Sequence, residues 1–305
     1  MSSSSLHKVY AIAEATYGTT PASGATAYVR NTSCTLATAR ESYTSEELTG
    51  DRIVPTVRMG SKQTGGDIGI EVAHSAHDQF YEAMMGGTWA SNVVKTGPTR
   101  RSFSILRSMN GVTPEWLRYE GQEVNSFSAT VPTSGIVTGS FGFIGKNQAN
   151  GKGSLTTGAR NNSEAMDGLN ATITLQVSGA TKTGIFATEL SFSAENGMEP
   201  RFAIGSDNVI AEATINRQIV TGQLTVYYET ASVDLLNAFL QGQKASITCQ
   251  LKDSDNKTLT FTFPAVRFTG GNTDSSGGAE IMMPLPFSAY YDTTTQSQFS
   301  ITRSA

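Results

Sequence analysis

Two copies of one short pattern, 156 positions apart, constrain this chain more than any other feature of its sequence. Five residues keep that spacing: Gly66, Ile68, Ile70, Asp78 and Gly86 align with Gly222, Leu224, Val226, Asp234 and Gly242. One constant spacing therefore covers a glycine, an alternating apolar run, an acidic residue and a second glycine. A chain with this repeat is expected to form two similar units in tandem.

Each copy predicts a β-strand followed by a short α-helix. After the first glycine, apolar and polar residues alternate, which is the period of a half-buried strand. Apolar residues three to four positions apart then follow Asp78 and Asp234, as on one face of a helix. We expect each aspartate to cap the start of its helix and the second glycine to end it in the left-handed conformation. The predicted units are residues 1–160 and 161–305, each with one flanking helix.

The composition favours a mainly β protein and disfavours tight DNA binding. Only 16% of the residues are charged, while the chain has 30 glycines. Residues 1–160 carry 14 basic and 12 acidic side chains, and residues 161–305 carry 8 and 14, so the halves have net charges of +2 and −6. A surface that binds nucleic-acid phosphates tightly needs a large excess of basic residues. The first half has an excess of only two, and the second half is acidic.

Cysteine usage and the N-terminus indicate a chain that folds in a reducing compartment. Cys34 and Cys249 are the only cysteines and occupy different places in the two copies, so we expect both to be free and inert. The first residues lack the basic and apolar regions of a secretory signal. No stretch approaches 18 consecutive apolar residues, so we expect no membrane insertion.

Four segments stand out from the rest of the predicted strands. Residues 9–30 resemble an extended arm with turns, which would either be mobile or be pinned against a neighbour, and the polar stretch 40–62 predicts a long excursion from the sheet. Residues 145–167 are poor in large apolar side chains and are the predicted linker between the units. A shorter excursion is expected over residues 195–219. The prolines of the last long strand, residues 281–291, favour an edge position or a bulge there.

No catalytic, cofactor or metal site is predicted. His74 and His77 with Asp78 are the nearest approach to a metal cluster, but a zinc site needs three or four ligands and no third His or Cys is near. With three histidines in all, a Ser-His-Asp arrangement has few possible bases. Gly65 and Gly66 lack the lysine that follows a phosphate-binding loop. The absence of such a constellation favours a protein that acts through its surfaces.

An ordered set of segments connects the chain with a known family. The set is EATYGTTP (14–21), RNTS (30–33), SEE (45–47), DR (51–52), RMG (58–60), GGDI (65–68) and DQFYEAMMGGTW (78–89). It resembles the major tail tube proteins of bacteriophages with long non-contractile tails. The likeness is close over most of residues 14–90 and elsewhere rests on length and strand pattern; only the ordered set is specific.

The resemblance implies a structural virion protein with two tandem tail-tube-type β-sandwich or barrel units. Family members join their sheets into rings with a continuous inner barrel, and the rings stack into the tube through which DNA leaves the capsid. Two units per chain predict homotrimeric, pseudo-hexameric rings; homohexameric rings with one unit outside are the alternative. The implied partners are further copies of the chain, the tape measure protein, tail tip and terminator proteins, and DNA that passes without specific binding. The implied location is the virion tail, after assembly in the host bacterial cytoplasm.

Within this reading, the excursion 40–62 is expected to stack one ring on the next. Its charged residues are the predicted contacts: Glu46, Glu47, Asp51, Arg52 and Arg58. The arm and the linker are second candidates for stacking. A different class of function, a carbohydrate-binding or adhesin-type β-sandwich, would use exposed aromatic residues such as Trp89, Trp116 or the pair Tyr290 and Tyr291.

Overall fold

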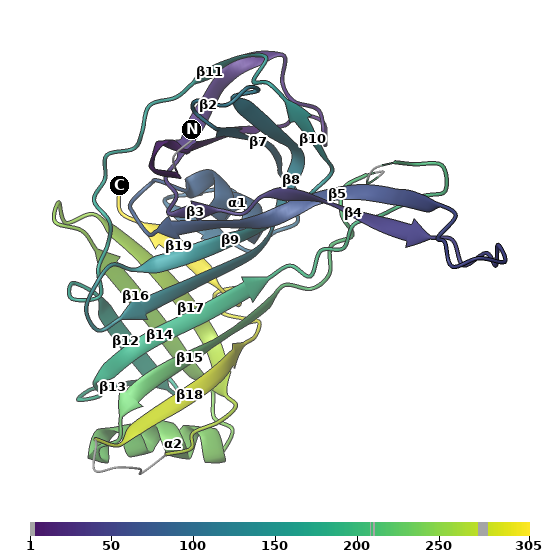
Figure 1. Ribbon diagram of the computed structural model, residues 1–305. Coiled ribbons are helices and arrows are strands. Elements are labelled where there is room, and N and C mark those ends of the chain that lie inside the picture. The colour runs from purple at the N-terminus through teal and green to yellow at the C-terminus, as the bar shows by residue number, and fades with distance from the viewer. Residues whose placement is uncertain (1–3, 208, 210, 274–279) are drawn as a thin grey trace.

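The computed structural model describes residues 4–207, 209, 211–273 and 280–305, and it confirms a mainly β fold. Strands make up 51% of the chain and helices 7%. The first half appears in the upper part of Figure 1 and the second half in the lower part, with one hairpin projecting sideways from the body. The regular elements follow from alternating apolar residues, which give each strand one buried face.

The elements of residues 1–160 are a 3-10 helix Ser4–Leu6, strands β1 Lys8–Ala13, β2 Ser23–Val29, β3 Ser33–Cys34, β4 Ala37–Thr44 and β5 Val57–Glu71, helix α1 Asp78–Met85, and strands β6 Val93–Lys95, β7 Ser102–Ser108, β8 Trp116–Pro132, β9 Thr138–Gly145, β10 Asn147–Asn150 and β11 Ser154–Thr157. Those of residues 161–305 are β12 Thr172–Val177, β13 Ala180–Lys182, β14 Ala187–Glu195, β15 Ile219–Tyr227, a 3-10 helix Thr230–Ser232, α2 Val233–Leu240, β16 Ala245–Lys252, β17 Thr258–Phe268, β18 Met282–Ala289 and β19 Ser300–Arg303. The repeated strand and helix are thus β5 with α1 and β15 with α2.

Two segments that were predicted as an arm and a linker contain paired strands. The predicted arm, residues 9–30, contributes β1 and β2; β1 pairs with both β2 and β7, and Val9 and Ala11 are fully buried. The predicted linker, residues 145–167, contains β10, which pairs with β8, and β11, which pairs in parallel with β2. The arm is thus pinned against neighbouring strands, which is one of its two expected states. The linker is partly regular because short runs of small residues can pair when a partner strand is already in place. The division of the chain at residue 160 stays a prediction.

One antiparallel sheet runs through both halves of the chain. Its strand order is β5, β9, β8, β14, β15 and β18, and the two halves meet where β8 pairs with β14 over seven residues, from Glu189 opposite Pro132 to Glu195 opposite Ser126. Over Met282–Leu285 the other edge of β18 has no strand partner among the described residues. This agrees with the edge position that the prolines of this strand favour. A second contact between the halves pairs β6 with β19.

An aromatic core lies behind this sheet and also extends through both halves. Phe127 stacks on Phe141 with ring centroids 4.7 Å apart, and it lies edge-on to Phe192, 5.8 Å away. Tyr81 of α1 contacts Phe127 and, from the second half, Phe261. All five rings are buried, and aromatic pairs add about 0.5–1.5 kcal/mol each beyond their buried area. The two cysteines, one half-buried and one buried, are free, as expected.

The aspartates of the repeat do not cap their helices, which corrects the expectation above. Asp78 is the first residue of α1, His77 occupies the capping position, and no side chain caps the helix. Asp78 instead forms an ion pair with Arg303, and Asp234 forms one with Lys182 at 2.7 Å. A carboxylate in the first turn still favours the helix through its dipole. Each aspartate therefore connects its helix to a distant segment.

The glycines of the repeat are required by backbone geometry and by close packing. Gly86 and Gly242 have φ values of 58° and 59° and follow the last turns of α1 and α2 in the left-handed conformation. A Cβ atom on Gly66 would lie 2.7 Å from the carbonyl oxygen of Thr35. A Cβ atom on Gly222 would lie 2.5 Å from a ring carbon of Phe287. Side chains at these two strand positions would collide with neighbours that the fold needs.

Candidate functional site

The most prominent feature of the surface is the hairpin of β4 and β5, which leaves the body at one side (Figure 1). The expected excursion over residues 40–62 is the outer part of this hairpin, and residues 45–56 form its tip. The tip contains Glu46, Glu47, Asp51 and Arg52, and Arg58 is the second residue of β5. All five are exposed, and none forms an ion pair within the described chain. Their charges are available to another molecule.

One acidic residue of the tip also shapes the loop. The Asp51 carboxylate accepts hydrogen bonds from the hydroxyl of Thr49 at 2.6 Å and from the backbone N–H of Ile53 at 3.2 Å. These bonds favour the charged form and lower the pKa of the Asp51 carboxyl. The tip therefore has a local turn held by its own side chains.

The hairpin also exposes apolar side chains, which the sequence reasoning missed. The exposed fractions are 97% for Leu48, 69% for Ile53, 59% for Val54, 57% for Val57 and 54% for Met59. Exposed apolar residues so close together leave apolar surface in contact with water, where another molecule could bury it. The signal in the sequence was the run of apolar residues inside a stretch that we had classed as polar. We call residues 37–65 of β4, β5 and their loop the stacking hairpin, after the role expected of it from the sequence.

The second distinctive surface is the face of the six-stranded sheet that points away from the core. We call it the polar sheet face, and small polar residues, glycine and proline make up most of it. Its members are Gly65, Asp67, Gly69 and Glu71 of β5; Thr138, Ser140, Gly142 and Ile144 of β9; Ser126, Ser128, Thr130 and Pro132 of β8; Glu189, Ser191, Ser193 and Glu195 of β14; Ile219, Thr221, Gln223, Thr225 and Tyr227 of β15; and Met282, Pro284, Pro286 and Ser288 of β18.

The charge of the polar sheet face has one sign. It carries four carboxylates, those of Asp67, Glu71, Glu189 and Glu195, and on these strands no lysine or arginine belongs to it. The residues between them are mostly hydroxyls, such as Ser128 opposite both Ser140 and Ser193. The result is a surface that is uncharged or acidic and therefore repels anions, with an open hollow of about 460 Å³ over Ser128, Ser191 and Thr221. Sequence alone could not find it, because its members come from six strands of both halves.

The histidines near α1 have structural roles. His77 Nε2 lies 2.8 Å from the backbone carbonyl of Arg30, and His74 Nε2 lies 3.2 Å from that of Ser304. Burial lowers the pKa of His77 to about 4, so this imidazole is neutral at pH 7. Within the described part of the chain, no group of three or more His, Cys, Asp and Glu residues could hold a metal ion.

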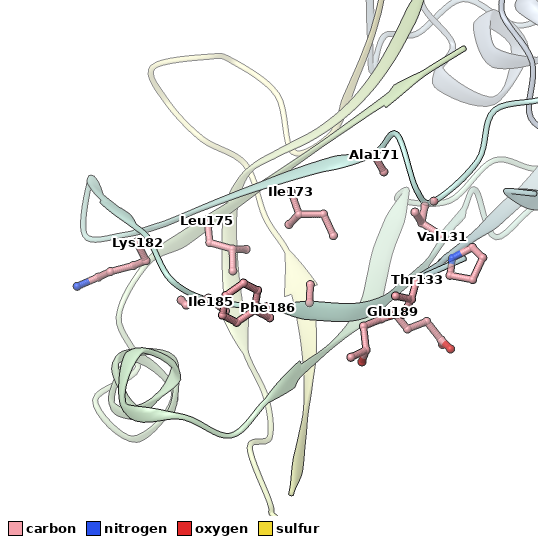
Figure 2. A pocket seen from close by; sticks show the side chains of 13 residues that line it. Val131, Thr133, Ala171, Ile173, Leu175, Lys182, Ile185, Phe186 and Glu189 are labelled. Atoms are coloured by element: carbon pink, nitrogen blue, oxygen red, sulfur yellow. The ribbon is translucent and has the colours of Figure 1, made fainter. Parts of the chain in front are cut away.

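A crevice opens between β12 and the start of β14, but its lining is not that of a ligand site (Figure 2). It has a volume of about 230 Å³ and is lined largely by apolar side chains, among them Ile173, Leu175, Ile185 and Phe186. The side chain of Lys182 points away from it in Figure 2. Small-molecule sites are larger, roughly 300–1,000 Å³, and have polar groups that converge on the ligand.

Most aromatic residues considered for glycan binding are engaged in packing. Trp89 is half-buried under the guanidinium of Arg303, 4.5 Å from its ring, and Trp116 packs 5.7 Å from Tyr10. Tyr290 is half-buried, whereas Tyr291 is 59% exposed. A glycan platform needs exposed rings arranged side by side, and these residues do not provide one.

Comparison with protein families identifies the family of the chain. A family model described as phage tail tube protein covers residues 4–289, nearly the whole chain. No curated protein matches the sequence. Among the described residues, no helix is long and apolar enough to cross a membrane.

Proposed function

Because this chain belongs to the phage tail tube protein family, we propose that it assembles into rings that stack into a hollow tube, the conduit for DNA ejection. The chain is a structural protein of the bacteriophage virion tail. The observation that carries the proposal is the polar sheet face, which is continuous, acidic and shared by both halves. It has the properties of the wall of a channel for DNA.

The proposed ring contains three chains and has pseudo-sixfold symmetry. Three strands of the first half and three of the second contribute to the polar sheet face, so both halves are suited to line the channel. In a ring of six chains with one half of each chain outside, the three strands that this half contributes to the polar sheet face would not line the channel. The pairing of β8 with β14 is the model for the joint between chains. The free edge of β18 is the candidate for such a joint, although it offers mainly carbonyl oxygens because Pro284 has no N–H.

The acidic charge of the proposed channel suits passage of DNA rather than binding. Phosphates are held by lysine and arginine, which the polar sheet face lacks. Carboxylates such as Glu189 and Glu195 repel the duplex weakly, and the serine hydroxyls between them carry no charge that would hold a phosphate. DNA would therefore slide without specific contacts.

The stacking hairpin is the proposed contact between consecutive rings. It projects beyond the body, and the five charged residues at and beside its tip form no ion pair within the described part of the chain. Glu46, Glu47, Asp51, Arg52 and Arg58 would provide charge pairing across the joint, and Leu48 and Ile53 would bury apolar surface. At the two ends of the tube we propose tail tip and terminator proteins as partners, and inside it the tape measure protein. Assembly in the host bacterial cytoplasm completes the proposal.

Electron microscopy of the purified protein at high concentration tests the proposal. We expect hollow stacked discs with six lobes and threefold modulation in class averages viewed along the axis. Six identical chains around the axis would overturn the trimeric ring but keep the tube. Monomers under every condition, also after addition of a tail tip complex, would overturn the tube.

A further inference from the structure

A loop of the second half holds the base of the stacking hairpin. Residues 196–218 connect β14 to β15, and the described part of this loop runs beside β4 and β5 in Figure 1. The backbone N–H of Lys62 donates to the carbonyl of Asp207 at 2.8 Å, and the hydroxyl of Ser61 donates to the carbonyl of Ser206 at 3.1 Å. Segments about 145 positions apart in the sequence are thereby joined.

Asp207 contacts both strands of the hairpin at one register position. Its Oδ1 lies 2.8 Å from Arg40 Nη2 of β4, and its Oδ2 lies 2.9 Å from Lys62 Nζ of β5. Arg40 and Lys62 are directly opposite each other in the β4–β5 pairing. Two cations facing each other across a strand pair destabilise that pair, and a carboxylate between them removes the repulsion.

The contact lies where the hairpin changes direction. The β4–β5 register shifts between Arg40 and Ser42, which is the irregularity of a β-bulge. All eight residues of β4 are exposed, so no hydrophobic core fixes the direction of the hairpin beyond this point. A two-stranded ribbon alone is marginally stable, and its orientation depends on contacts at its base.

The loop itself is anchored to the body and can resist movement of the hairpin. At one end, the buried Asn196 amide donates to the carbonyls of Met84 and Val124, both at 3.1 Å. Near the other end, the buried Glu123 carboxylate accepts from the N–H of Ala213 at 3.0 Å. Through these bonds the loop connects the stacking hairpin to the core.

We propose that Asp207 is a positioning residue: its carboxylate holds Arg40 of β4 beside Lys62 of β5, a contact that we call the clip, so that the stacking hairpin and residues 196–207 act as one rigid projection. The second half has no equivalent of the stacking hairpin. There β15 begins at Ile219, which the repeat aligns with Gln63 of β5, and the chain before it is the loop that contacts the hairpin. Each chain then has one such projection, and a ring of three chains contacts the next ring at three places. This consequence rests on the proposed function; the clip itself does not.

The test compares Asp207→Ala with Asp207→Glu and with Asp255→Ala, a control that removes an exposed acid from the turn between β16 and β17. Hydrogen exchange of the full-length protein at low concentration reports on the clip. We expect the Lys62 amide to exchange about tenfold faster in Asp207→Ala, because local opening becomes easier, and to stay unchanged in the control. Asp207→Glu should keep most of the protection. Unchanged exchange in Asp207→Ala would overturn the clip.

Microscopy of the same variants tests the consequence for assembly. Asp207→Ala should form rings but few tubes, and adding Lys62→Gln should restore part of the tubes because one of the two facing cations is gone. Normal tubes from Asp207→Ala with fast Lys62 exchange would overturn the role of the clip in stacking. If the unchanged protein forms neither rings nor tubes, the proposed function fails, whereas the exchange result still decides on the clip.

Discussion

Single buried polar residues determine how this fold responds to pH. The Nε2 atom of His77 faces a carbonyl oxygen, which can only accept, so Nε2 carries the hydrogen of the neutral ring. The Nδ1 atom is buried and has no hydrogen-bond partner among the described residues. Protonation would place a charge there that nothing compensates, and this is the physical cause of the low pKa of His77.

We therefore expect the free energy of unfolding to fall as the pH drops from about 6.5 to about 4. In this window the unfolded chain binds a proton at His77 and the folded chain does not, so protonation favours unfolding. The loss attributable to His77 is about 3 kcal/mol when complete. Urea unfolding of the wild type and of His77→Gln at several pH values measures it. Equal slopes for both proteins would contradict the assignment.

Glu123 shows how one carboxylate can join three segments. It is buried on β8, pairs with Arg100 at 2.7 Å and accepts from Ala213 at the base of the loop 196–218. Burial raises the pKa of the Glu123 carboxyl, while Arg100 acts in the opposite direction. The residue gives the loop its anchor in the core.

Glu123→Ala should lower the free energy of unfolding by about 2–3 kcal/mol, because it leaves the N–H of Ala213 and the guanidinium of Arg100 without their acceptor. Glu123→Gln should cost less, since the amide oxygen still accepts. Urea unfolding checks both, with the exposed Glu195→Ala as the control. A loss as small as that of the control would show that water replaces the carboxylate at no cost.

At the scale of elements, the stacking hairpin is separate from the core in both packing and stability. Its tip has no buried side chains in the described structure apart from the half-buried Ser45. Deletion of residues 44–54 should leave a folded chain with little change in melting temperature, because surface segments away from the core contribute little. The same chain should not form tubes. Electron microscopy and thermal unfolding measure the two properties, and normal tubes would rule out the hairpin as the stacking element.

Point variants separate the apolar from the charged contribution of the hairpin. We expect the double variant Leu48→Ser, Ile53→Ser to reduce tube formation at any salt concentration, because less apolar surface is then buried between the rings. Glu46→Gln with Glu47→Gln should matter mainly at low salt, where charge pairs across the ring joint are least screened. Light scattering over a range of salt concentrations measures both. Equal salt dependence of the two pairs of variants would contradict this division.

At the scale of the whole molecule, the polar sheet face has two of its four carboxylates, Glu189 and Glu195, at the joint where both halves meet. Ser128 and Ser193 are neighbours across the β8–β14 joint and lie at its centre. Replacing both with lysine should give tubes that retain DNA, and the retention should weaken as salt rises because it comes from phosphate contacts. Gel shift and filter binding with assembled tubes measure it, and Ser128→Asn with Ser193→Asn is the matched control. No retention by lysine tubes would place this face outside the channel.

The sequence by itself determined the mainly β class, the repeated strand and helix, and the glycines that end the helices. These depend on periodicity and on backbone conformation, which are local properties of residues such as Ile68, Ile70 and Gly86. It also indicated that residues 40–62 leave the sheet. It did not indicate that β4 and β5 continue into this segment, or that the segment exposes apolar side chains. It misplaced the caps, because Asp78 finds a stronger partner in Arg303, 225 positions away.

Only the tertiary structure decided how distant segments combine. The strands of residues 9–30 and 145–167 have weak patterns of their own and become regular through partners such as β7 and β8. The polar sheet face exists because β8 pairs with β14, and the clip at Asp207 exists because the loop 196–218 returns to the base of the hairpin. Pairing between strands and contacts between loops depend on the whole chain, because their partners lie far apart in sequence and no local pattern records which ones will meet.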